Sequence, residues 1–327
     1  MANRKAPLYI LGRPHSGNTM LATMLNQHPE LRAYRGEGEF FERLPDLEAL
    51  EDAHQQRQAV ADEIGKAEDP PLDKDTRNEV RARLPQKRTK SRQRSLVEQY
   101  VFGKSYLAQN SGAERWVQKA TSYVFHVPTV AKHLPHAQYL FILRNPMDLA
   151  ASKKRRGAKE KWLRTLWGWR EGVQRARELE AKMPERFCVV KYENIVREPE
   201  ASLRNVCAFC GVSYQASVLD IPHVNRAETP YNRLSADRGL NTERVFYFID
   251  ELTAAEAAAV RWFVGGDLVR EMYPDLPQVE RPGDSEVGKE IVNIVWRGGT
   301  HLITEQGMLL LSEPRRLLNR LRRRISG

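Results

Sequence analysis

The sequence predicts an α/β fold in which helices flank a parallel sheet. Apolar runs that are typical of strands alternate along the chain with helix-type segments. These runs are continuous rather than alternating with polar residues, as expected for strands that are covered on both faces. The first run leads through a short glycine-bounded loop into a helix-type segment, and such a connection presents backbone N–H groups to an anion.

This first connection predicts a P-loop-like anion site. A strand over Leu8–Leu11 is followed by a loop that reads G-x-x-x-x-G-N-T, the spacing of a nucleotide-triphosphate P-loop. Asn18 stands where such a loop has its lysine, so the charge that reaches the terminal phosphates of ATP is missing. We therefore expect the backbone amides, Ser16 and Thr19 to hold a nucleotide that does not react at a triphosphate. A simple tight turn is the alternative.

Four further strands are predicted, each with a polar residue at or just after its end. They are Leu31–Tyr34, Trp116–Lys119, Ala137–Leu143 and Phe187–Val190. A Walker-type site needs a strand that ends in Asp to hold Mg²⁺. Here the most apolar strand ends on Arg144, and the last strand leads into Lys191, so cations stand where a metal ligand is expected. This pattern favours a metal-free site.

Helices are expected between and after these strands. Asn145 as the N-cap, Pro146 at the first position and Asp148 in the first turn predict a helix start. Further helices are expected over Ser95–Gln109, through Trp162–Leu179, and over Glu198–Cys210 before Gly211. Cys207 and Cys210 of that helix have CxxC spacing, but no second pair accompanies them for a four-cysteine zinc site, so we expect two small core residues. The three cysteines of the chain are too few for a disulfide framework.

Length and composition predict one domain over residues 1–275, with a helical, charged insertion at about 42–115, and a basic amphipathic extension over 276–327. Six basic residues and no acidic one occur from Arg83 to Arg94, either as a solvated surface or as a surface for an anionic acceptor. After Pro314, a leucine stripe opposes arginines. This tail either lies on anionic membrane, packs on the domain or is solvated.

The net charge of +10 and the pI of about 9.5 favour anionic partners: a nucleotide, an acidic polysaccharide, nucleic acid or a membrane surface. Leu8–Leu11 is too short for the apolar core of a signal peptide, and no apolar run is long enough to cross a membrane. We therefore expect a cytoplasmic protein, with possible peripheral contact with membrane through its tail.

Three motifs together resemble the sulfotransferases that use 3′-phosphoadenylyl sulfate (PAPS), and more closely their bacterial and carbohydrate-acting branch. Pro14–Thr19 is similar to the family's P-R/K-S-G-T-T loop. Arg144–Asp148 with Ser152 matches R-x-P-x-D followed by serine. Tyr192–Ile195 and the later Phe209-Cys210-Gly211 resemble Y-E-D/N-L and F-x-G. The resemblance extends weakly to Tyr231-Asn232-Arg233, and implies the P-loop-like core of the sulfotransferase type.

The resemblance also implies roles for individual residues. Ser16–Thr19 hold the 5′-phosphosulfate, Arg144 and Ser152 hold the 3′-phosphate, and Tyr192 lies near the adenine; a core tyrosine is the alternative. Glu37 is the base that accepts the acceptor's proton, with Glu39 as the alternative, and Lys119 lies near the transferring group. His15 stands where the family has a catalytic lysine or arginine, and Arg13 could supply that cation. The nucleotide-binding set is thus Arg13, His15, Ser16, Gly17, Asn18, Thr19, Arg144, Ser152, Tyr192 and Arg233.

These roles predict transfer of a sulfuryl group from PAPS to a hydroxyl or amine of a sugar, glycolipid or small molecule. The product would be adenosine 3′,5′-bisphosphate, with no metal and no nucleic-acid partner. A P-loop phosphotransferase is the first alternative, disfavoured by Asn18 and by the missing Mg²⁺ aspartate. A catalytically degenerate nucleotide- or polyanion-binding protein is the second, suggested by His15 and the basic runs.

Overall fold

The computed structural model describes residues 6–85, 92–220, 240–280 and 282–312. The chain divides into two compact units: Met1–Arg144 with Gly172–Thr242, and Asn145–Glu171 with Glu243–Gly327. Three predicted features lie outside the described residues, namely Arg233, residues 86–91 of the basic run 83–94, and the tail after Pro314. The division into a domain over 1–275 and an extension stays a prediction.

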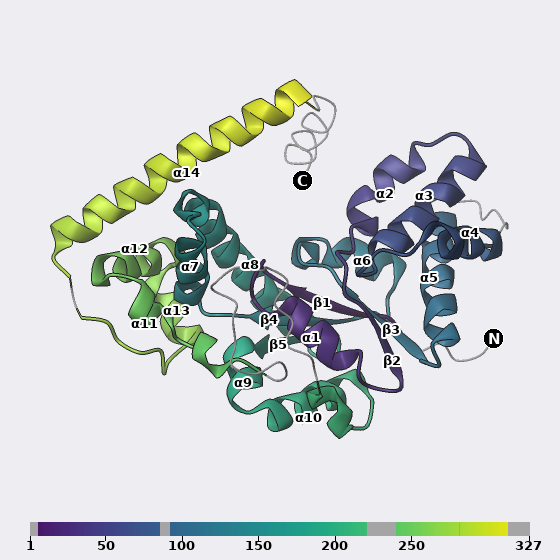
Figure 1. The fold of residues 1–327 in the computed structure, drawn as a ribbon, viewed down its shortest axis with the longest axis horizontal. Coiled ribbons are helices and arrows are strands. Elements are labelled where there is room, and N and C mark those ends of the chain that lie inside the picture. The colour runs from purple at the N-terminus through teal and green to yellow at the C-terminus, as the bar shows by residue number, and fades with distance from the viewer. Residues whose placement is uncertain (1–5, 86–91, 221–239, 281, 313–327) are drawn as a thin grey trace. The chain divides into compact units, whose positions relative to one another are not determined.

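The first unit contains a five-stranded sheet whose paired strands all run parallel, in the order β2-β3-β1-β4-β5 (Figure 1). This confirms the predicted fold class. The strands are β1 (Leu8–Gly12), β2 (Leu31–Tyr34), β3 (Arg115–Lys119), β4 (Gln138–Leu143) and β5 (Phe187–Lys191).

The central strand explains why the sheet is apolar on both faces. All five residues of β1 are buried. On one face, Tyr9 packs against the rings of Trp116, Tyr123 and Tyr139, with centroid distances of 5.6–5.8 Å. Helix α1 packs against β1, β2 and β3. Because both faces are covered, the strand sequence shows no polar alternation.

Helices of the first unit follow the strands as the sequence predicts, including the helix expected over Ser95–Gln109, which is α5. Helices α2 to α5 pack on one another beside β2 and β3. The helices are α1 (Asn18–Leu25), α2 (Phe40–Glu48), α3 (Ala53–Lys66), α4 (Lys74–Arg83), α5 (Arg92–Asn110), η1 (Tyr123–Phe125), α6 (Val127–His133), α9 (Tyr192–Arg197), α10 (Pro199–Cys210) and η3 (Ala216–Leu219).

The second unit is helical within the described residues. It begins with α7 (Pro146–Arg155), whose predicted cap is confirmed: the Asn145 side chain accepts from the Asp148 N–H at 2.8 Å. The others are η2 (Lys159–Lys161), the first part of α8 (Trp162–Lys182), η5 (Thr242–Arg244), α11 (Phe248–Glu251), α12 (Ala254–Val264), α13 (Gly266–Met272) and α14 (Asp284–Ser312). In the described part of the chain, no helix combines the length and apolarity that crossing a membrane requires.

Candidate functional site

The residues predicted to act together follow the carboxyl ends of the five strands. Glu37 follows β2, Lys119 ends β3, the loop 12–17 follows β1, Arg144 follows β4, and Tyr192 follows β5. Parallel strands bring these positions to one edge of the sheet. The chain leaves β1 toward β2 on one side and leaves the adjacent β4 toward β5 on the other. Ligands of open parallel sheets bind at such a switch point.

The loop after β1 has the turn that an anion site needs. The Ser16 N–H donates to the Arg13 carbonyl at 3.1 Å, and Ser16 is buried. His15 and Gly17 have φ of 70° and 101°, in the left-handed region. This conformation bends the chain directly into α1, so the first N–H groups of the helix follow the loop.

Asn18 braces the loop, which explains its presence at the lysine position. Its amide donates to the Arg13 carbonyl at 3.1 Å, across the loop that it closes. Gly12 gives the side chain room, because a Cβ there would lie 2.4 Å from the Asn18 Oδ1. The Asn18 side chain therefore fixes the loop, and its backbone N–H stays at the helix start.

Arg144 is held against this loop by two contacts. Its guanidinium donates to the His15 carbonyl at 3.0 Å and lies over the Tyr192 ring, 4.2 Å from the centroid. Arg144 is only 8% exposed. The same ring packs on Gly17, where a Cβ would come within 2.7 Å of it. Tyr192 thus fixes both the cation and the loop, and a buried guanidinium beside backbone N–H groups suits a phosphate.

Glu37 and Lys119 form an ion pair at the other half of this edge. The Lys119 Nζ lies 3.2 Å from the Glu37 Oε2, and the Thr121 N–H donates to Oε1. The Gly38 N–H donates to the Lys119 carbonyl at 2.9 Å, which joins the loop after β2 to the end of β3. The Glu37 side chain is 37% exposed. It is therefore fixed in orientation and still open to a substrate.

Glu39, the alternative base, is held differently. Partial desolvation, together with the carboxylates of Glu42, Glu63 and Glu37, raises its pKa. Among the described residues, no hydrogen bond or ion pair fixes its carboxylate. The geometry therefore favours Glu37 as the oriented carboxylate.

The remaining predicted residues lie at separate positions. The Arg13 side chain runs along α8, where a Cβ on Gly172 would lie 3.2 Å from its Cδ. The Thr19 carbonyl accepts from the Thr23 hydroxyl at 2.9 Å within α1. Ser152 lies on α7 in the second unit and is half-buried. Its role rests on the motif alone.

A family model described as "Sulfotransferase family" matches residues 7–216, which is more than half of the 327 residues. The chain belongs to the sulfotransferase family. The match spans all five strands and every predicted site residue except Arg233.

Comparison with solved structures also gives matches to sulfotransferases. The sulfotransferase domain from the Synechococcus PCC 7002 olefin synthase matches with a TM-score of 0.56 and 20% identity, over 84% of this chain and 98% of that one. Sulfotransferase STF9 from Mycobacterium avium gives 0.43 and 18%, over 86% and 79%. A sulfotransferase from Alicyclobacillus acidocaldarius gives 0.42 and 16%, over 88% and 99%. No curated protein matches the chain.

The structure adds a buried support that the sequence interpretation missed in this sulfotransferase. Lys104 of α5 is fully buried and donates to the Gln118 Oε1 at 2.5 Å. The Gln118 amide donates to the carbonyls of Gly36 and Lys119, at 3.2 and 2.7 Å. The Lys104 Nζ also lies 3.4 Å from the centroid of the Tyr34 ring. Through these contacts, Lys104 and Gln118 support the two segments that carry Glu37 and Lys119.

A sequence signal for Lys104 existed. Val97, Tyr100 and Ala108 are buried and lie on one helical face, at spacings of three and eight residues. Lys104 falls on that same face, four residues after Tyr100. Burial lowers its pKa well below the ordinary value for lysine.

The second missed feature is the role of Asp148 in the R-x-P-x-D motif. Its buried carboxylate accepts from the Asn145 amide at 2.7 Å and from the N–H groups of Phe246 and Phe248, at 2.9 and 3.1 Å. The Tyr247 hydroxyl donates to its carbonyl at 2.9 Å. Asp148 therefore anchors residues 246–248 to the start of α7, a structural role within the second unit.

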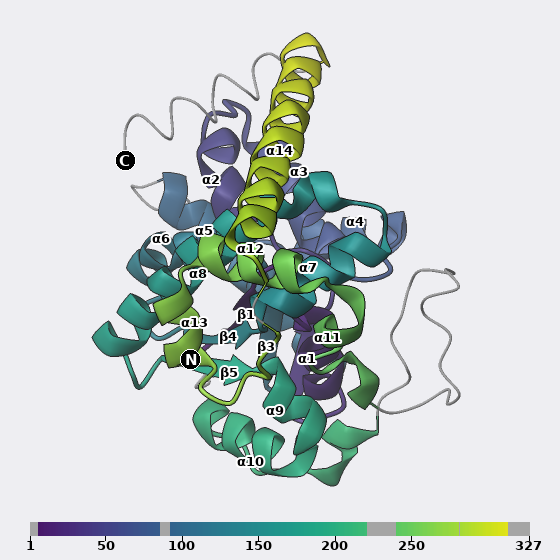
Figure 2. The same cartoon turned by 90° about the vertical axis from the view of Figure 1, so that its left-hand side faces the viewer.

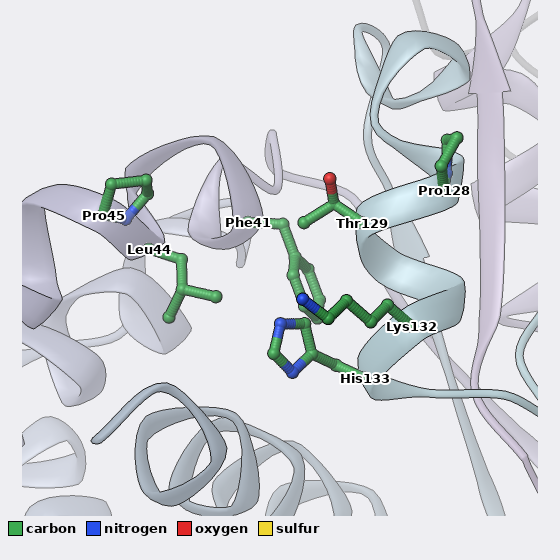
Figure 3. Close-up of a pocket in the computed structure, with 7 residues that line it drawn as sticks. All are labelled: Phe41, Leu44, Pro45, Pro128, Thr129, Lys132 and His133. Carbon is green, nitrogen blue, oxygen red and sulfur yellow. The ribbon is translucent and has the colours of Figure 1, made fainter. Parts of the chain in front are cut away.

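A cavity of about 380 Å³ lies between α2 and α6 (Figure 3). The two helices that form its walls follow, along the chain, the two segments that hold Glu37. The Phe41 N–H donates to the Tyr123 hydroxyl at 2.7 Å and so joins these two parts of the chain. Phe41 and Leu44 face Lys132 and His133 across it. Its lining is Phe41, Leu44, Pro45, Pro128, Thr129, Lys132 and His133.

Neither a metal cluster nor a reactive thiol is found among the residues that the structure describes. No group of three or more His, Cys, Asp or Glu side chains there is arranged to hold a metal. Cys207 and Cys210 are buried and unpaired, as predicted for small core residues. Burial raises the pKa of Cys210 to about 12 and that of Cys188 to about 11, so these thiols stay protonated near neutral pH.

Proposed function

We propose that this sulfotransferase uses PAPS and transfers its sulfuryl group to a hydroxyl or amine of a sugar, glycolipid or other small acceptor. The supporting observation is the edge of the sheet, where a buried cation held against an anion-binding loop is followed by an oriented carboxylate–lysine pair. The loop and Arg144 suit the charged donor. Glu37 suits the proton of the acceptor.

The donor would be bound mainly by groups that are already fixed. The first backbone N–H groups of α1 and Ser16 face the phosphosulfate, and the Arg144 guanidinium pairs with a phosphate. The Asn18 side chain is engaged with the Arg13 carbonyl, so it braces the loop and carries no charge to the donor. His15, exposed at the loop tip, supplies a donor or a positive charge toward the bridging oxygen.

The reaction is an in-line displacement at sulfur. The acceptor oxygen or nitrogen forms a bond to sulfur while the bond from sulfur to the bridging oxygen of the 5′-phosphate breaks. Glu37 takes the acceptor's proton, and the electron pair of the broken bond leaves on the phosphate of adenosine 3′,5′-bisphosphate. Fixed donors at that oxygen stabilise the charge that grows there. Lys119, paired with Glu37, keeps the carboxylate oriented and brings positive charge to the sulfuryl group.

The cavity between α2 and α6 supports an acceptor that has an apolar part. Phe41, Leu44 and Pro45 give it an apolar wall, and Lys132 and His133 add polar groups opposite. Apolar pockets with few polar groups are typical of small-molecule sites. The acceptor's apolar part would occupy this cavity with its nucleophile directed toward Glu37.

A ligand comparison tests the donor. If adenosine 3′,5′-bisphosphate binds only the folded protein, it should add about 2.7 kcal/mol to the free energy of unfolding at 100 times its Kd. The melting temperature should rise accordingly. Mg·ATP should have a much smaller effect. Stabilisation by Mg·ATP and none by the bisphosphate would contradict the proposal and indicate a phosphotransferase.

Activity tests the transfer itself. The full chain is incubated with sulfur-labelled PAPS and a panel of sugars, glycolipids and amphipathic alcohols, and labelled products are counted. We expect label on at least one hydroxyl or amine acceptor, and none with Glu37→Gln. Tight binding of the bisphosphate without label transfer to any acceptor would indicate a degenerate nucleotide-binding protein.

A further inference from the structure

Helix α14 presents an apolar face that nothing in the described residues of the second unit covers. Its opposite face is docked: Ile294 is 3% exposed, and Gly298 approaches α8 so closely that a Cβ would lie 2.3 Å from the Leu163 Cβ. Figure 2 shows the helix beside α12, which it contacts. Val292, Trp296 and Ile303 are 66%, 72% and 73% exposed. Spacings of four and seven residues place these three on one side of the helix.

Few charged residues accompany this face in the sequence. From Ile291 to Thr304 the sequence contains Arg297 and no aspartate or glutamate, and Glu290 and Glu305 flank this stretch. The last acidic side chain before this stretch, Glu290, has its carboxylate 3.9 Å from the Lys159 Nζ. An exposed tryptophan between aliphatic residues, with few charges nearby, has the composition of a helix face that lies in a membrane interface.

The chain beyond α14 adds positive charge. Residues 313–327, outside the described residues, include six arginines and one glutamate. Each basic residue near an anionic leaflet contributes about 1 kcal/mol of attraction. The apolar face and the basic segment follow each other directly, so one surface could engage both.

We propose that the Val292–Trp296–Ile303 face of α14, together with the arginines that follow it, docks on an anionic lipid surface. Trp296 would sit at headgroup level, where its ring is buried and its N–H stays solvated. A second copy of the protein and the chain's own tail fit this face less well. The protein's net charge of +10 opposes pairing with a second copy, and the apolar face of Val292, Trp296 and Ile303 offers no carboxylate to the arginines of the chain's own tail.

Vesicle co-sedimentation of the full chain tests this surface. We expect binding to vesicles with about 30% phosphatidylserine, little binding to pure phosphatidylcholine, and loss of binding at about 0.5 M salt. Trp296→Ser should weaken binding about tenfold, and Arg322→Ser/Arg323→Ser/Arg324→Ser about 10²-fold. Trp167→Ser is the matched control, because that tryptophan on α8 is 62% exposed and lies outside the proposed face.

Several outcomes would overturn the proposal. These are no binding to anionic vesicles, equal binding to both vesicle types, or equal weakening by Trp296→Ser and Trp167→Ser. A concentration-dependent dimer in sedimentation equilibrium that Trp296→Ser abolishes would assign the face to a second copy instead. All of these variants should keep the bisphosphate-induced rise in melting temperature, so the result is independent of the proposed reaction.

Discussion

The two halves of the sheet edge are built by different means. At β1, β4 and β5, the groups suited to phosphate are buried and held by backbone and ring contacts, as when Arg144 lies between the His15 carbonyl and the Tyr192 ring. At β2 and β3, Glu37 is held by an ion pair and one N–H, and it remains 37% exposed. The donor half is therefore rigid before any ligand binds, and the acceptor half stays open to solvent.

The largest expected effect is a loss of kcat in the acceptor half of the sheet edge, with no change in nucleotide binding by the donor half. Glu37→Gln keeps the shape and the acceptor oxygen for the Thr121 N–H but removes the basicity. It should lower kcat by about 10²–10⁴-fold and leave the Kd for adenosine 3′,5′-bisphosphate unchanged. The matched control is Glu39→Gln, expected to stay active. If only the control loses activity, the base is Glu39.

The next effect tests the loop tip. His15→Gly accepts the φ of 70° without strain and removes only the imidazole. If His15 supplies a donor to the leaving oxygen, kcat should fall by about 10²-fold. His15→Arg should remain active, because a guanidinium supplies both a donor and a positive charge at this position. Full activity in His15→Gly would assign the role to Arg13.

A smaller effect is expected at Arg144. Arg144→Ala should weaken binding of adenosine 3′,5′-bisphosphate by about 1.5–3 kcal/mol, the range for a hydrogen bond to a charged group. Calorimetric titration with adenosine 5′-phosphate, which lacks the 3′-phosphate, provides the comparison. That ligand should lose much less affinity. Equal losses for both would mean that Arg144 acts by bracing the loop through the His15 carbonyl.

The smallest effect concerns the cavity between α2 and α6. Thr129→Trp places an indole at its exposed rim and should raise the KM for the acceptor by about three- to tenfold, with kcat and bisphosphate affinity unchanged. Ala208→Trp, at an exposed position of α10, controls for an added surface indole. An unchanged KM in Thr129→Trp would mean that the acceptor binds elsewhere.

Much of the fold could be predicted because local signals and the global fold agree. The strand Leu31–Tyr34 and the helix stop at Gly211 are where the sequence places them, and Gly211 has the left-handed φ of 69° that such a stop requires. The cap at Asn145 was predictable for the same reason, since its contact spans three residues. Motif spacing also singled out the loop, Arg144 and Glu37, which follow the carboxyl ends of β1, β4 and β2, and their roles stay predictions.

Contacts between distant residues could not be predicted in this way. Tyr192 was expected near the adenine, but its packing on Gly17 and Arg144 joins positions 48 or more residues apart. The same holds for Asp148, which binds N–H groups about 100 residues later. Hydrophobic periodicity does not reveal such pairs, because they depend on which strands become neighbours.

The buried Lys104 has a consequence for the whole fold. Burial depresses its pKa in the folded protein, so between that value and the unfolded value near 10.4 the unfolded chain binds a proton that the folded chain lacks. The free energy of unfolding should therefore rise with pH across this window, and flatten above it. Urea denaturation midpoints measured from pH 7 to 10 would show the slope, and Lys104→Met should reduce it. The burial of this lysine thus destabilises the folded protein least in mildly alkaline solution.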